Sequence, residues 1–74
     1  METRIRDLRE DHDLSQSEVA EIIGITQRKY SYLETGQQQW TDELLVSLAK
    51  FYHTSIDYLL KQTDVFEPYP NHKK

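Results

Sequence analysis

The fold of this chain is decided by the run Leu14-Ser-Gln-Ser-Glu-Val-Ala-Glu-Ile-Ile-Gly-Ile-Thr-Gln-Arg-Lys-Tyr-Ser-Tyr-Leu-Glu-Thr-Gly36. The run contains both glycines of the chain, Gly24 and Gly36, and each one follows apolar residues spaced three and four positions apart. Glycine adopts the positive φ angle at which many helices end, with little steric strain. The run therefore predicts two short helices, over residues 16–23 and 27–35, joined by a tight turn.

Both predicted helices begin with a capping signature. Ser15 followed by Glu18 is typical of a capping box, and Thr26 can cap the second helix. Apolar residues flank these caps as hydrophobic staples, and the same arrangement occurs at a third helix start, in the pairs Leu14/Val19, Ile25/Tyr30 and Trp40/Leu45. The connection between the first two helices is too short for an antiparallel pair, so they are expected to cross at a steep angle with Ala20 at the contact.

The remaining helices follow from apolar periodicity. It predicts helices over residues 3–12, 42–52 and 56–61, the last one capped by Ser55. The sequence thus predicts an all-α domain over residues 1–62, followed by a tail over residues 63–74. Its predicted core consists of Ile5, Leu8, Val19, Ile22, Ile23, Tyr30, Leu33, Leu45, Leu48, Ala49, Tyr52, Ile56, Leu59 and Leu60.

Five pieces of sequence carry a resemblance to a known family. They are Leu-Ser-Gln-x-Glu-Val-Ala from Leu14, Ile-Gly-Ile-Thr-Gln from Ile23, Tyr-Ser-Tyr-Leu-Glu-x-Gly from Tyr30, Ser-Leu-Ala-Lys-Phe-Tyr from Ser47 and Ser-Ile-Asp-Tyr-Leu-Leu from Ser55. In this order and spacing, residues 4–60 resemble the phage repressor and Cro-type helix-turn-helix family, also called XRE. The resemblance implies a compact five-helix, lambda-repressor-like domain whose third helix lies in the major groove of operator DNA.

The helix predicted over residues 27–35 has one polar face. At 100° per residue, Tyr30 and Leu33 face inward. Glutamine can pair with adenine, arginine with guanine, and tyrosine can contact a thymine methyl group. Composition alone favours a merely solvated face, whereas the resemblance favours contact with bases. We therefore predict that the base-contacting residues are Gln27, Arg28, Ser31 and Tyr32.

Contacts to the DNA backbone are expected around this face. Lys29 lies on its flank, Thr35 at its C-terminal end, and Gln37 and Gln38 in the loop that follows. The resemblance implies a further contact, because Gln16 matches a family glutamine that hydrogen-bonds a phosphate at a helix N-terminus.

Two charged residues are assigned a structural role. Arg9 and Glu34 match a pair that in many relatives forms an ion pair between the first and third helices. The alternative is two unrelated surface charges, whose pairing would contribute at most ~1 kcal/mol. We favour the structural pair and count neither residue as a DNA contact.

The net charge opposes a simple DNA-binding interpretation. Nine Lys and Arg residues against thirteen Asp and Glu residues give −4, whereas non-specific DNA affinity comes from cations at phosphates. This predicts modest affinity and a shallow salt dependence. The first hypothesis is a transcriptional repressor that binds a near-palindromic, double-stranded operator as a homodimer. The alternative is a protein-interaction module, antitoxin-like or an anti-repressor partner, that keeps the fold but binds a protein.

The tail is expected to be mobile or to dock. Two prolines prevent helix continuation, and its apolar side chains exceed what a solvated tail needs. Because relatives pair through this region, we predict a homodimer interface formed by Tyr58, facing outward, with Val65, Phe66 and Tyr69.

Composition argues against several other classes of protein. With no cysteine, disulfides and Cys-based zinc sites are excluded, and the histidines are too far apart in sequence to suggest a metal site. No cofactor is expected, and no activated nucleophile, carboxylate pair or phosphate-binding glycine loop suggests an enzyme. No apolar run is long enough to span a membrane, so we expect a cytoplasmic protein without a membrane partner.

Overall fold

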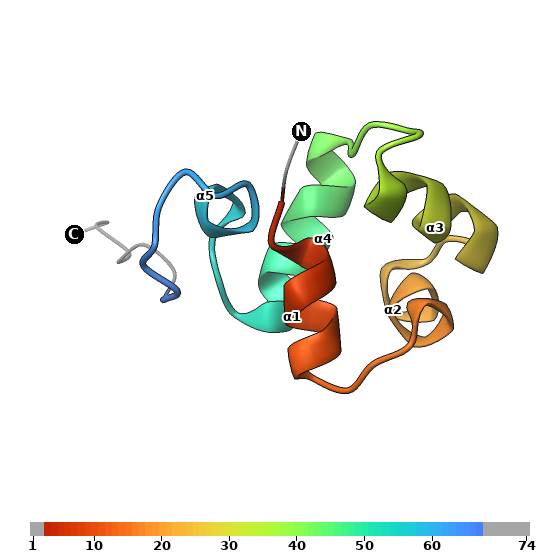
Figure 1. The fold of residues 1–74 in the computed structure, drawn as a ribbon, viewed down its shortest axis with the longest axis horizontal. Coiled ribbons are helices and arrows are strands. Elements are labelled where there is room, and N and C mark those ends of the chain that lie inside the picture. The colour runs from red at the N-terminus through yellow and green to blue at the C-terminus, as the bar shows by residue number, and fades with distance from the viewer. Residues whose placement is uncertain (1–2, 68–74) are drawn as a thin grey trace.

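A computed structural model describes residues 3–67 of the chain. These residues form five helices and no strand: α1 (Ile5–Asp11), α2 (Gln16–Ile23), α3 (Gln27–Thr35), α4 (Asp42–Tyr52) and α5 (Ile56–Leu59). α2 packs against α3, α4 contacts both α2 and α5, and α5 lies at the opposite end of the molecule from α3 (Figure 1). The predicted all-α class is confirmed.

The predicted helix starts are present as hydrogen bonds. The Ser15 hydroxyl accepts from the Glu18 backbone at 3.0 Å, and the Glu18 carboxylate accepts from the Ser15 backbone at 2.8 Å, which completes the capping box. Thr26 and Ser55 also accept from backbone N–H groups of their helices' first turns. Because these signals are local, the observed bounds of α2, α3 and α4 equal the predicted ones.

α1 and α5 are shorter than predicted, for tertiary reasons. Ahead of α1, the Arg4 backbone N–H donates to the Leu59 carbonyl at 2.8 Å, and this ties Arg4 to α5. At the end of α5, Lys61 takes a φ angle of +63°, and the helix ends at Leu59. Neither event has a signature in the local periodicity.

The core lies between α1, α4 and the α2–α3 pair. Its buried side chains are Ile5, Leu8, Val19, Ala20, Tyr30, Leu45, Leu48, Ala49, Tyr52 and Leu59, with Leu33 also buried. Ile23, Ile56 and Leu60 are partly buried against this cluster. The prediction was wrong for Ile22, which is 48% exposed. Periodicity places Ile22 beside the apolar stripe of α2, but it does not show how far neighbouring helices cover that stripe.

The segment after α5 folds back onto its own domain as far as the description extends. The Arg4 guanidinium donates to the Tyr58 carbonyl at 2.9 Å and the Thr63 carbonyl at 3.0 Å, and it pairs with Asp64 at 2.7 Å. The buried hydroxyl of Thr54 donates to the Phe66 carbonyl. Thr63, Asp64 and Phe66 therefore tie this segment to the domain to which it belongs.

Candidate nucleic-acid interface

α3 is capped at both ends by local hydrogen bonds. At its start, the Thr26 hydroxyl accepts from the Lys29 backbone N–H at 3.1 Å. At its end, Gly36 takes a φ angle of +89°, and the Gln38 backbone N–H donates to the Tyr32 carbonyl at 3.1 Å. The buried side chain of Tyr30 anchors the inner face and meets the Trp40 ring edge-on. The inner face of α3 is thus packed on the core, and the opposite face is left exposed.

The four predicted base-contacting residues lie along this helix. Gln27 and Arg28 are exposed on its first turn, Tyr32 is 37% exposed one turn later, and Ser31 is half-buried. Among residues 3–67, Arg28 has no ion-pair partner that would compete with a base or phosphate. The outer face therefore offers an amide, a guanidinium and a phenol at neighbouring positions.

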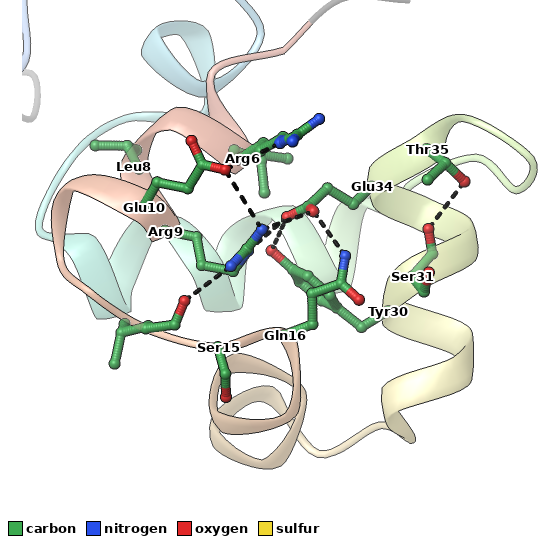
Figure 2. A network of polar contacts seen from close by, with 12 residues as sticks. Arg6, Leu8, Arg9, Glu10, Ser15, Gln16, Tyr30, Ser31, Glu34 and Thr35 are labelled. Atoms are coloured by element: carbon green, nitrogen blue, oxygen red, sulfur yellow. Dashed lines mark hydrogen bonds and ion pairs between the residues drawn. The ribbon is translucent and has the colours of Figure 1, made fainter.

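The predicted phosphate contacts fall into two groups. Lys29, Gln37 and Gln38 are exposed and accessible to a DNA backbone. The Thr35 hydroxyl, by contrast, donates to the Ser31 carbonyl at 2.9 Å (Figure 2). A phosphate oxygen only accepts hydrogen bonds, so Thr35 must release this bond before it can donate to one.

Behind the outer face, three side chains converge on the Glu34 carboxylate (Figure 2). Arg9 donates to both of its oxygens, at 2.9 Å and 3.1 Å, and also to the Leu14 carbonyl at 2.8 Å. Tyr30 and Gln16 each donate to the same carboxylate at 2.8 Å. Side-chain exposure is 13% for Arg9 and 4% for Glu34, so the contact is a buried, two-pronged ion pair between α1 and α3.

These contacts determine how Glu34 titrates. Burial alone would raise its pKa, but the hydrogen bonds from Arg9, Gln16 and Tyr30 and the positive charge of Arg9 hold that pKa below its ordinary value. The hydrogen bond to Glu34 likewise raises the pKa of Arg9, and burial beside Glu34 raises the pKa of Tyr30. Glu34 is therefore an ionised carboxylate at neutral pH.

Gln16 belongs to this network as well as to the expected DNA contacts. Its amide nitrogen donates to Glu34, and its amide oxygen accepts from the Gln27 amide at 3.2 Å. One N–H of the Gln16 amide remains for a phosphate. Sequence reasoning missed both bonds, although one signal was present: Gln16 and Gln27 are each the first residue of a helix in the crossed pair.

The predicted dimer residues are only partly free. The expectation that Tyr58 faces outward is wrong, because its ring meets the Phe66 ring edge-on at 5.4 Å and the Arg4 guanidinium lies 4.4 Å above it. Val65 is 54% exposed and Phe66 is 40% exposed. Tyr69 lies outside the described residues.

Two further observations concern other kinds of site. Within residues 3–67, no group of three or more histidine or acidic side chains is placed to hold a metal ion. The same residues include no helix with the length and apolar character needed to cross a membrane.

A sequence profile described as "Helix-turn-helix" matches residues 5–59, which include all five helices. The chain belongs to the phage-repressor (XRE) type of helix-turn-helix family. The resemblance found in the sequence is confirmed. This helix-turn-helix family is one of transcriptional regulators and not of enzymes.

Two curated relatives of this helix-turn-helix chain share about two-fifths of the matched positions. One is an uncharacterized HTH-type transcriptional regulator, YobD, of Bacillus subtilis (strain 168), 38% identical over 65 residues, which are 88% of this chain and 58% of the relative. The other is the cryptic phage CTXphi transcriptional repressor RstR of Vibrio cholerae, 40% identical over 62 residues, which are 84% of this chain and 56% of the relative. The chain thus spans little more than half of each relative's length. No solved structure matches it significantly.

Proposed function

We propose that this chain is the DNA-binding part of a transcriptional repressor, with α3 in the major groove of a near-palindromic operator. The outer face of α3 carries this proposal. It presents the exposed Gln27 amide and the Arg28 guanidinium, which has no ion-pair partner among residues 3–67, on a helix capped at both ends. Matches to a named repressor and to a regulator of the same family support it. Since its target is DNA, the protein is placed in the cytoplasm.

Each side chain is assigned a chemical role. Gln27 pairs with the N6 and N7 edge of adenine, and Arg28 with the O6 and N7 edge of guanine. Tyr32 contacts a thymine methyl group, and Ser31 contacts a base edge beside it. The phosphate contacts are assigned to Gln16, Lys29, Thr35, Gln37 and Gln38.

The net charge of −4 makes the electrostatic contribution small. Binding then depends on the local field of Arg28 and Lys29 and on neutral donors such as amides and backbone N–H groups. Affinity should fall less steeply with salt than for a basic protein, because fewer counterions are released.

The repressor is proposed to act as a homodimer. The segment 63–67, which contains the exposed Val65 and Phe66, lies beside α5 at the end of the molecule opposite α3 (Figure 1). A two-fold contact there would leave the two α3 helices free to enter successive major grooves about 34 Å apart. Sedimentation tests this part: Val65→Asp should lower the dimer fraction. Ile22→Asp, at a similarly exposed apolar position on α2, is the matched control and should not lower the dimer fraction.

Selection from a random duplex library at low salt tests the function itself. The expected result is enrichment of a sequence with two-fold symmetry and half-sites about one helical turn apart. Failure to enrich any sequence, together with stable capture of a protein, would contradict the proposal and favour a protein-interaction module.

A further inference from the structure

The Glu34 carboxylate and the base-facing Gln27 amide are linked through a single side chain. Both residues lie on α3, seven positions and about two turns apart, so they lie along the same edge of the helix, where the Glu34 side chain is buried and Gln27 is exposed. Gln16, at the start of α2, reaches between them. It donates to Glu34 at 2.8 Å and accepts from Gln27 at 3.2 Å.

The direction of this chain of hydrogen bonds is fixed at one end. An ionised carboxylate only accepts hydrogen bonds, so Gln16 must turn its NH2 group toward Glu34. The Gln16 carbonyl then faces away from Glu34, and Gln27 must turn its own NH2 group toward that carbonyl. What remains exposed on Gln27 is its carbonyl oxygen and one N–H.

We infer that Glu34, acting through Gln16, sets the orientation of the Gln27 amide and thereby makes it select adenine over guanine. Adenine offers a donor at N6 and an acceptor at N7, which match the exposed oxygen and N–H of Gln27. The reversed amide would have its oxygen tied to Gln16 and only N–H groups exposed. These would match the two acceptors of guanine, O6 and N7. The inference rests on the proposed function, and Glu34 is a positioning residue in it.

Glu34→Gln should reverse the chain of hydrogen bonds. Arg9 donates to both Glu34 oxygens, so the variant must lose one of these bonds. The shorter Arg9 bond, at 2.9 Å, and the Tyr30 bond both reach Oε2, so we expect the new amide oxygen at that position and the new NH2 group at the Oε1 position, facing Gln16. Gln16 must then accept from residue 34 and donate to Gln27. The variant has the same shape as the wild type but inverts every donor and acceptor along the link.

The experiment compares affinities for duplexes that differ at one base pair. The affinity of Gln27→Ala is first measured for the selected operator and for its single-pair substitutions. The base pair at which this variant no longer discriminates between bases is the pair that Gln27 reads. At that pair, Glu34→Gln should lower the ratio of affinity for adenine to affinity for guanine by about tenfold or more. The ratio is independent of the folded fraction, because both duplexes are measured with the same protein.

Two further variants separate positioning from stability. Tyr30→Phe removes a hydrogen bond from the other oxygen of Glu34 and should leave the ratio unchanged. Gln16→Ala should also lower the ratio, and adding Glu34→Gln to it should have no further effect. If Gln16→Ala and Glu34→Gln both keep the wild-type ratio, the inference is overturned while the proposed function stands. If the wild type selects no site, both are overturned.

Discussion

Arg9→Ala is expected to destabilise the protein far more than the loss of a surface ion pair. The variant leaves Glu34, with a side chain only 4% exposed, as a buried charge without its cation. Removing one partner of a fully buried pair costs about 3–5 kcal/mol. Arg9 is 13% exposed, and Glu34 keeps its hydrogen bonds from Gln16 and Tyr30. The expected loss is therefore at the lower end, about 3 kcal/mol.

Urea denaturation followed by circular dichroism measures this loss. A domain of this size has only ~3–5 kcal/mol of stability, so Arg9→Ala should be close to unfolding without denaturant. In a double-mutant cycle with Glu34→Leu and Arg9→Met, the double variant should recover most of the stability lost by either single change. Single losses below ~0.5 kcal/mol with no coupling would refute this reasoning.

Three other outcomes are expected. Acidification should remove stability as the pH falls below about 4.3, the ordinary pKa of Glu, because the lowered pKa of Glu34 makes the unfolded chain bind its proton first. Subtracting the stability of Glu34→Gln, measured over the same pH range, from that of the wild type isolates the contribution of Glu34. If the two stability curves run parallel with pH, Glu34 makes no such contribution. Lys29→Ala should weaken binding to all DNA sequences alike and reduce the slope of log affinity against log salt by about one; a changed base preference would assign Lys29 to a base instead. The Tyr52 hydroxyl is buried without a hydrogen-bond partner among residues 3–67. Tyr52→Phe should therefore leave the free energy of unfolding unchanged or raise it by about 1 kcal/mol. A loss above about 1 kcal/mol would show that the hydroxyl is hydrogen-bonded.

The middle of the fold was predictable because its signals are local. Ser15, Thr26, Gly24 and Gly36 each act within one turn of a helix, and the bounds of α2 and α3 follow from them. The start of α1 depends on a hydrogen bond between Arg4 and Leu59, 55 positions apart in the sequence, and the end of α5 on the positive φ angle of Lys61. No local pattern predicts a contact of that kind.

The sequence predicted which residues lie at the site better than it predicted the hydrogen bonds between them. The outward face of α3 follows from helical periodicity, and the structure shows Gln27, Arg28 and Tyr32 exposed there. The links from Glu34 through Gln16 to Gln27 depend on the angle at which α2 and α3 cross, which sequence spacing constrains only loosely. The contact between Tyr58 and Phe66 could not be foreseen either, because it depends on how the segment after α5 folds back onto that helix.

Binding of Arg28→Ala to the selected operator tests the central claim most directly, since exposed Arg28 is the strongest candidate for reading a base on α3. Affinities of wild type and variant are measured for that operator and for all single-pair substitutions within one half-site. The variant should lose about 1–3 kcal/mol on the operator, and its base preference should relax at one G·C pair only. An equal loss on operator and scrambled DNA, or no loss on either, would contradict the assignment of α3 as the element that reads the sequence.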